Sequence, residues 1–415
     1  MTPHTPSWAT ALLGERAVCT RVICGGTSRT TLLLAVPPRS GGVVARYDAG
    51  AGPLARTPFT LRREAAAYAA AAAADLPVPA VVATAEDGRS FAVEEVAGSV
   101  DRTAEALDDY LRVLGALHAT GIDHAPTGHA GFDPAGRDDL EVWRTIAETL
   151  VVRPAPLLTF AFDALERHAA LDGIERPVFC HGDAGFGNYL HLDDRVTGLV
   201  DWEMAHTGDA HDDLASVAVR AVLSGIDLGD YRARIVRHWE PASGMRFDQR
   251  RFDLGAASTL TRMVVSCLVA LDHPRADTDR TVQLMGLPIM EIHLLRVLAL
   301  LDGVALDALP EAPLDDEFAA EMARLLEEPL PSTDDPGIAR RRRYLADKPD
   351  FARSGPVPER AKSPLVRSDF ARSGPVPERA KSPIEELSWK AAGRLRAVAA
   401  SRPLAEAPIA GLGPR

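Results

Sequence analysis

Cysteine is scarce in this chain: its 415 residues include only Cys19, Cys24, Cys180 and Cys267, with no C-x-x-C pair. This excludes a disulfide-stapled scaffold and a thiolate zinc site, and it favours a reducing, cytoplasmic location. The first residues lack the basic and apolar segments of a signal peptide. The longest uninterrupted apolar runs, near residues 65–74 and 263–271, are far shorter than the ~20 residues of a membrane helix. We therefore expect neither a leader peptide nor a membrane span.

Positive charge is also in short supply, since 46 Lys and Arg face 58 Asp and Glu, for a net charge of −12. That balance argues against a general nucleic-acid binder and against an anionic membrane surface as the main partner. After residue 330 the balance reverses to 17 Lys and Arg against 10 Asp and Glu, and 12 of the 31 prolines lie there. We expect residues 331–415 to form a separate, flexible tail.

The tail contains an internal duplication. The segment DFARSGPVPERAKSP occurs at residues 350–364 and again at 369–383. Each copy has too little apolar surface to offset the entropy of ordering, which predicts a largely disordered linker. A docking peptide for a protein partner is the alternative. A short helix is expected to follow, with Ser382 as N-cap, Pro383 as the first helical residue and an end near Ala400.

Residues 15–97 show the pattern β-β-β-α-β-β. Two strands in 17–36 flank a polar turn, and a third covers 42–47. A helix is predicted from Thr57-Pro58 through an alanine-rich stretch to Ala74, because proline is favoured at the first helical position and alanine has high helix propensity. Two further strands are expected at 80–85 and 90–96.

From residue 98 to 330 the periodicity is mainly helical. Helices are predicted at 104–120, 140–150, 157–171, 212–224, 252–271, 281–301 and 316–326, with an irregular segment at 178–200. The expected fold class is α+β. It consists of a small antiparallel-sheet lobe (15–97), a larger mainly helical lobe (98–330) and the tail.

The segment CHGDAGFGNYLHLDDRVTGLVDWE, residues 180–203, carries the strongest chemical signal. Asp183 and Asn188 stand five residues apart, and Asp201 follows a short apolar run. Phosphoryl transfer needs a carboxylate at the acceptor hydroxyl and oxygen ligands that hold Mg²⁺ on the nucleotide phosphates. The D-x4-N spacing supplies the first carboxylate and an amide from one loop, and Asp201 can complete the metal site.

This segment resembles the aminoglycoside phosphotransferase-like family of the protein-kinase-like fold. The run from Gly198 through Asp201, Trp202 and Glu203 to Asp213 is similar to the branch that also occurs fused to acyl-CoA dehydrogenases. Supporting matches in order along the chain are the Gly25-Gly26-x-Ser28 turn, LPVPAVV (76–82), FAVEEVAG (91–98) and LGALHATG (114–121). The similarity covers about residues 15–300 and leaves out the tail.

The resemblance implies roles for individual residues. Asp183 would be the catalytic base or the acid that orients the acceptor hydroxyl, and Asn188 and Asp201 would ligate Mg²⁺. His181 would brace the loop, Trp202 and Glu203 would pack and anchor it, and Asp213 would cap the following helix.

The nucleotide, ATP or GTP, would be held mainly by the sheet lobe. Arg46 stands where kinases usually have lysine, and Glu64 would be its ion-pair partner. Arginine stays cationic but meets phosphate with a different geometry. The remaining nucleotide contacts would come from Gly25, Gly26, Thr27 and Ser28 at the phosphates and from Glu94, Glu95 and Val96 at the base.

The expected activity is transfer of a γ-phosphoryl group to a hydroxyl of a small molecule. Two alternatives remain: a nucleotide-binding pseudokinase that acts as a regulatory module, and a metal-dependent hydrolase using His181, Asp183, Asp201, His206 and His211. The acceptor is open between an aminoglycoside, another hydroxylated metabolite and a hydroxyacyl thioester.

Overall fold

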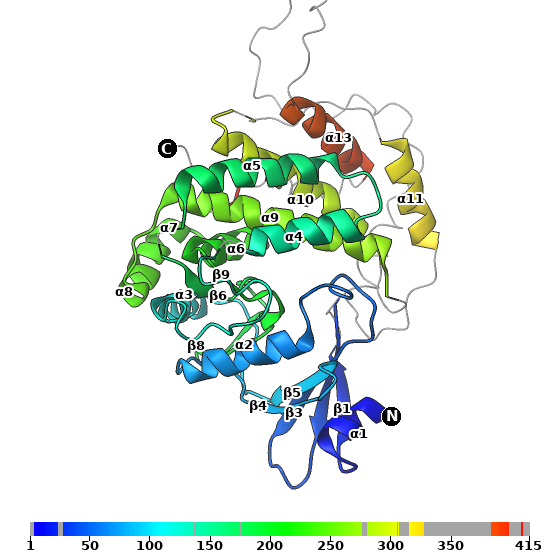
Figure 1. The fold of residues 1–415 in the computed structure, drawn as a ribbon, viewed down its shortest axis with the longest axis vertical. Coiled ribbons are helices and arrows are strands. Elements are labelled where there is room, and N and C mark those ends of the chain that lie inside the picture. Colours follow the sequence, from blue (N-terminus) through cyan, green and yellow to red (C-terminus); the bar gives the residue numbers. More distant parts are fainter. Residues whose placement is uncertain are drawn as a thin grey trace, which may run out of the picture.

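The computed structural model describes residues 4–23, 28–136, 138–174, 176–275, 280–304, 306, 315–327, 383–397 and 408–409. The described chain forms two lobes, with a small sheet lobe below a larger helical lobe in the view of Figure 1. The predicted α+β arrangement is therefore confirmed.

The sheet lobe is built on five antiparallel strands in the order β1-β2-β3-β5-β4. Helix α2 follows β3 in sequence and lies between the sheet and the helical lobe (Figure 1). The strands and helices of this lobe are α1 (Ser7–Leu13), β1 (Val18–Ile23), β2 (Thr30–Ala35), β3 (Gly42–Tyr47), α2 (Leu61–Ala73), β4 (Val81–Thr84) and β5 (Ser90–Glu94).

Alternation along β3 decides which side chains face the interlobe side. Val43 and Ala45 are fully buried in a small core with Ala9 of α1, a helix that the sequence did not predict. Val44 instead packs against the main core, which includes residues of α2. Successive side chains of a strand point to opposite faces. Arg46 therefore shares the face of Val44 and points toward α2.

The predicted start of α2 at Thr57-Pro58 is wrong. The helix begins at Leu61, and Thr60 is its N-cap, because its side chain accepts a hydrogen bond from the Arg63 amide. The hydroxyl of Thr57 is bonded instead to the Leu54 carbonyl at 2.7 Å. Both threonines suit an N-cap, and local hydrogen bonding selects the second.

Every helix predicted for the helical lobe is present, and each of its ends lies within three residues of the predicted end. The lobe also contains short strands within the segment expected to be irregular, and a π-helical turn after α7. Its elements are α3 (Ala104–Ala119), α4 (Asp138–Leu150), α5 (Pro156–Asp172), β6 (Val178–Cys180), β7 (Tyr189–Leu192), β8 (Arg195–Leu199), η1 (Trp202–Met204), β9 (His206–Gly208), α6 (Ala210–Leu223), α7 (Tyr231–Arg234), η2 (Ile235–Trp239), α8 (Glu240–Ser243), α9 (Gln249–Asp272), α10 (Arg280–Leu301) and α11 (Asp316–Glu327).

Two of these helices, α9 and the Gln283–Leu301 part of α10, are long and apolar enough to cross a membrane by length and composition alone. In each, 78% of the most apolar stretch is buried inside the fold. They pack mainly on each other, and α9 also packs on α6 and α5 and α10 on the carboxy-terminal helix, as the core helices of a globular lobe do.

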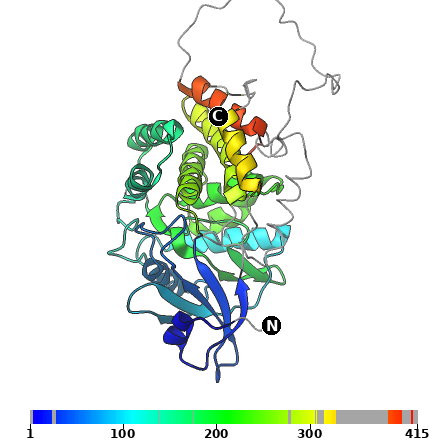
Figure 2. The same cartoon turned by 90° about the vertical axis from the view of Figure 1, so that its right-hand side faces the viewer.

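The predicted carboxy-terminal helix is confirmed as α13 (Pro383–Ala397). It packs against α10 and α11 (Figure 2). Arg394 of α13 bonds to Glu291 of α10 at 2.6 Å, and Ile384, Ala391 and Leu395 are buried. The tail is thus not wholly separate from the helical lobe. Most of the duplicated segment lies outside the described residues.

Candidate active site

The His181-Gly182-Asp183 turn leaves strand β6 at the level of the interlobe boundary. Gly182 has a φ of +82°, and a Cβ there would lie 1.9 Å from the Met204 carbonyl oxygen. Only glycine combines this left-handed backbone with such close approach to a neighbouring chain segment. The turn is therefore packed directly against the η1–β9 connection, which follows Asp201.

Asp213 holds this turn from helix α6. Its carboxylate accepts from the amides of His181 (2.7 Å) and Gly182 (2.8 Å) and is fully buried. Burial by itself would raise the pKa of Asp213, but the bonds from His118 and the turn hold it at about 2. The expectation that Asp213 caps α6 is wrong. Asp209 is the N-cap, with its side chain accepting from the His211 amide.

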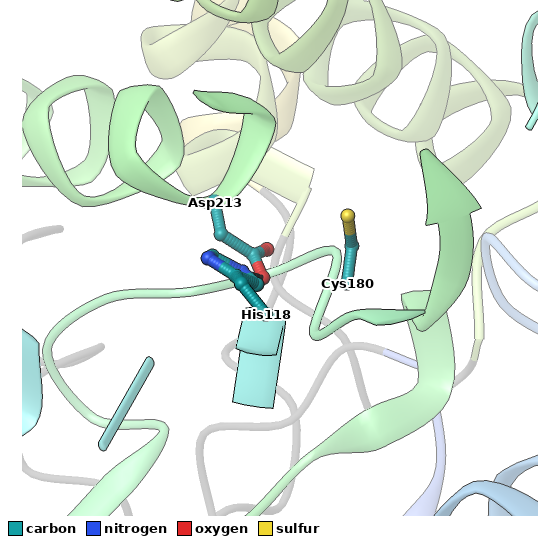
Figure 3. A group of neighbouring side chains, drawn as sticks. All are labelled: His118, Cys180 and Asp213. Atoms are coloured by element: carbon teal, nitrogen blue, oxygen red, sulfur yellow. Dashed lines mark hydrogen bonds and ion pairs between the residues drawn. The ribbon is translucent and has the colours of Figure 1, made fainter. Parts of the chain in front are cut away.

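His118 on α3 completes this support, beside Cys180 (Figure 3). His118 Nε2 lies 3.0 Å from Asp213, and its Nδ1 accepts a 2.8 Å hydrogen bond from Trp239. His118, Cys180 and Asp213 are the one group with the spacing of a metal site in the part of the chain that the structure describes. Both imidazole nitrogens are already bonded, so the group acts as a structural brace.

Asp183 lies at the end of the turn with two polar neighbours. Its Oδ2 accepts a 2.7 Å hydrogen bond from Asn188 Nδ2, and its Oδ1 pairs with Arg220 of α6 at 2.5 Å. Asn188 also bonds to the Asp183 carbonyl through the same nitrogen. The two predicted loop residues are therefore in direct contact, and Arg220 supplies a counter-charge.

Asp201 reaches the same place from the β8 side. The Val200 amide donates to the Asn188 carbonyl at 3.0 Å, and His181 Nε2 lies 3.0 Å from the Val200 carbonyl. The backbone of Asp201 is left-handed, with φ +68°, and its amide donates to the Tyr68 hydroxyl of α2. The Asn188 Nδ2 donates to Asp183, and Asp201 Oδ1 accepts from Arg46. Asn188 Oδ1 and Asp201 Oδ2 are therefore the oxygens that could ligate a divalent cation.

Arg46 binds three acidic side chains at the lobe boundary. It pairs with Glu64 of α2, with Asp201 Oδ1 at 2.7 Å and with Glu203 Oε2 at 2.8 Å. Burial would raise the pKa of Asp201, yet Arg46 holds it below its usual range. For Glu64 burial dominates over Arg46, and its pKa is raised. The predicted Arg46–Glu64 pair thus belongs to a larger charge cluster that includes Asp201.

Ser28 joins this cluster from the β1–β2 turn, since its hydroxyl donates to Glu203 Oε2 at 2.8 Å. Glu203 of the helical lobe therefore has two polar side-chain partners in the sheet lobe, Ser28 and Arg46, whereas Trp202 is fully buried. Gly25, Gly26 and Thr27 lie outside the described residues.

The predicted base-binding segment connects the lobes after β5. The amides of Glu94 and Glu95 donate to the carbonyls of Ala80 and Gly42 at 2.9 Å, so neither is available to a nucleotide base. The side chain of Glu94 pairs with Arg39 near the surface. The carbonyls of Glu94 and Glu95, and Val96, stay as predicted contacts of the base.

Sequence reasoning missed two arginines of this site, Arg220 and Arg63. Arg220 was detectable as the one charged residue in the apolar half of α6, seven positions after Asp213 and hence on nearly the same face. Arg63 precedes Glu64 and is only 1% exposed. An arginine in an alanine-rich helix gave no sign that it would be buried.

The histidines of the hydrolase alternative do not converge on one point. His206 Nδ1 lies 3.1 Å from the Met204 carbonyl and its Nε2 faces Arg262. His211 is bonded through Nδ1 to Asp209 and through Nε2 to the Asp248 amide. Their nitrogens serve the packing of the helical lobe, and nothing in this arrangement favours a hydrolase.

Comparison with known proteins agrees with this architecture. The sheet lobe, the hinge and the helical lobe together have the protein-kinase-like fold. A candidate aminoglycoside phosphotransferase from Ralstonia eutropha JMP134 matches with a TM-score of 0.51 at 19% identity, covering 69% of this chain and 93% of that one. An ethanolamine kinase from Plasmodium vivax matches with a TM-score of 0.50 at 10% identity, covering 66% and 82%. A choline kinase from Streptococcus pneumoniae also gives 0.50, at 13% identity, covering 68% and 92%.

The sequence model of the phosphotransferase enzyme family matches residues 22–254, more than half of the chain. The chain therefore belongs to the phosphotransferase enzyme family, and it is a small-molecule phosphotransferase acting on hydroxyl groups. No curated protein sequence matches it.

Proposed function

We propose that this enzyme transfers the γ-phosphoryl group of a Mg²⁺-bound nucleoside triphosphate to a hydroxyl of a small molecule, with Asp183 as the residue that meets the hydroxyl. The observation that carries the proposal is the meeting of Asp183, Asn188 and Asp201 beside Arg46. One carboxylate, one amide oxygen, one metal-binding acid and one fixed cation are what in-line phosphoryl transfer requires.

Asp183 is placed to accept the proton of the acceptor hydroxyl or to orient it. Its Oδ2 is held by Asn188 and its Oδ1 by Arg220, so the carboxylate keeps a fixed orientation. A fixed orientation lowers the entropic cost of bringing the reacting groups together.

Asn188 and Asp201 would hold the cation through oxygen atoms, and Mg²⁺ when bound would neutralise charge on the phosphates. Arg46 is bonded to Asp201 in this structure. A triphosphate bound beside Asp201 would compete for the Arg46 guanidinium, which can bind phosphate bidentately. Glu64 and Glu203 would keep Arg46 in place during that exchange.

The acceptor belongs to one of the three classes that the sequence leaves open: an aminoglycoside, another hydroxylated metabolite or a hydroxyacyl thioester. The similarity to the acyl-CoA-dehydrogenase-linked branch favours the latter two, and a cytoplasmic location would suit them. The donor is open between ATP and GTP. The metal and acid positions Asp183, Asn188 and Asp201 are all present, which argues against a pseudokinase.

The test is a screen of these acceptor classes for nucleotide consumption, with ATP and GTP in parallel. Consumption should require both Mg²⁺ and an acceptor. Binding of nucleotide with no turnover for any acceptor would favour the pseudokinase instead. Phosphatase activity in the absence of nucleotide would favour the hydrolase.

A further inference from the structure

Arg63 of α2 makes an unusual set of contacts for a residue of the sheet lobe. Its Nε donates to the Ala130 carbonyl at 2.8 Å, its Nη1 to the Glu203 carbonyl at 2.9 Å and its Nη2 to the Ala205 carbonyl. All three guanidinium nitrogens are therefore bonded to main-chain oxygens of the helical lobe. Arg63 is 1% exposed.

Two aromatic rings enclose the same guanidinium. Its carbon lies 4.7 Å from the ring centre of Phe59 and 4.6 Å from that of Phe132. Burial lowers the pKa of Arg63 to about 10, so the group stays charged at neutral pH. Since arginine has a planar fork of donors, these contacts fix both its position and its plane.

The next residue along α2 is Glu64, which pairs with Arg46. Four residues further, the Tyr68 hydroxyl accepts from the Asp201 amide. Helix α2 is thus attached to the segment 201–205 at two points, Arg63 and Tyr68, on either side of Glu64. Figure 1 shows the helix at the boundary of the two lobes.

From these contacts we infer that Arg63 is a positioning residue: it locks α2 to the helical lobe and so keeps the Arg46–Glu64 pair assembled against Asp201 before the nucleotide binds. The inference rests on the proposed function, because it assigns Arg46 to the phosphates. Because Arg63 is buried and all three of its guanidinium nitrogens are bonded to carbonyls, it would act through Glu64 and not by binding nucleotide or acceptor itself.

Binding of Mg²⁺·AMP-PNP, a non-hydrolysable ATP analogue, tests this by calorimetry without knowledge of the acceptor. Arg63→Lys keeps the charge but cannot reach three carbonyls in three directions. We expect about tenfold weaker binding, or about 1.4 kcal/mol. Arg62→Lys is the matched control, because Arg62 is the preceding residue of α2, is exposed and, within the described part of the chain, bonds only to the Glu86 carbonyl. Its affinity should equal that of the native protein.

A double-mutant cycle distinguishes positioning from general loosening. If Arg63 acts through Glu64, then Glu64→Gln should cost much less affinity in the Arg63→Lys background than in the native or Arg62→Lys background. Independent effects that multiply would overturn the inference, as would native affinity in Arg63→Lys.

Should Arg63→Lys fail to fold, Phe132→Leu removes one enclosing ring and leaves the three hydrogen bonds. Two- to threefold weaker binding of the analogue is expected, and unchanged binding would overturn the inference. If the native protein binds only the guanine analogue Mg²⁺·GMP-PNP, the same variants are compared with that analogue. Failure of the native protein to bind either analogue is a different result, which would refute the proposed function.

Discussion

Asp213 gives the sharpest energetic prediction for the catalytic turn. Its two carboxylate oxygens accept from the amides of His181 and Gly182 and from the His118 ring, with no exposure to solvent. Asp213→Asn keeps the volume but offers one oxygen only. In either orientation the new amino group faces at least one backbone N–H, which leaves buried donors unpaired.

The magnitude follows from the pKa. A carboxyl with an ordinary pKa of 3.8 that falls to about 2 on folding contributes about 2–3 kcal/mol to the free energy of unfolding at neutral pH. Adding the unpaired donor, we expect Asp213→Asn to lower that free energy by about 3–4 kcal/mol at pH 7. Because the folded-state pKa is depressed, this contribution is complete above about pH 5 and is lost as the pH falls through about 2.

Equilibrium urea unfolding followed by circular dichroism at several pH values measures this. The difference in the free energy of unfolding between the native protein and Asp213→Asn should stay constant from pH 7 to about pH 5 and become smaller below about pH 4. Asp227→Asn is the control, because Asp227 accepts from the Gly229 amide in an exposed turn where asparagine can accept equally. A loss below about 1 kcal/mol in Asp213→Asn, or one no larger than in the control, would refute the reasoning.

Three further substitutions test other parts of the site. Arg46→Lys should weaken Mg²⁺·nucleotide binding several-fold in calorimetry, since one ammonium cannot replace separate guanidinium nitrogens on Asp201 and Glu203; unchanged affinity would contradict this. Arg220→Met should lower kcat at least about tenfold and leave nucleotide affinity unchanged, because its Nη1 orients Asp183; equal loss of affinity would count against that role. Gly182→Ala should destabilise by more than about 3 kcal/mol in urea unfolding, whereas Gly229→Ala, with φ +59° and open space at Cβ, should cost about 1 kcal/mol; equal losses would refute the steric argument.

The sheet lobe was largely predictable because its signals are local. Residues 42–47 were predicted to form a strand and do form β3. The alternation of side chains along β3 explains why Arg46 points toward α2. The start of α2 was misplaced because Thr57 and Thr60 are equally good N-caps on paper. Their hydrogen bonds to Leu54 and Arg63 distinguish them only in the folded chain.

In the site, too, contacts between residues close in sequence were predictable and contacts between distant residues were not. The D-x4-N spacing placed Asp183 and Asn188 in contact, since both stand on one loop. Asp213 was misread as a cap, because its partners, the amides 181 and 182, are about thirty residues away in sequence. The docking of α13 through Arg394 and Glu291 depends on a contact across more than a hundred residues, which composition cannot show.

Asp183 carries the central claim, so its removal is the most direct test. In the presence of Mg²⁺, an acceptor found by the screen and labelled nucleotide, transfer of the γ-phosphoryl group can be followed for the native protein and for Asp183→Ala. We predict that the variant binds nucleotide with near-native affinity and transfers phosphate at least about a hundredfold more slowly. Transfer at the native rate by Asp183→Ala would contradict the account.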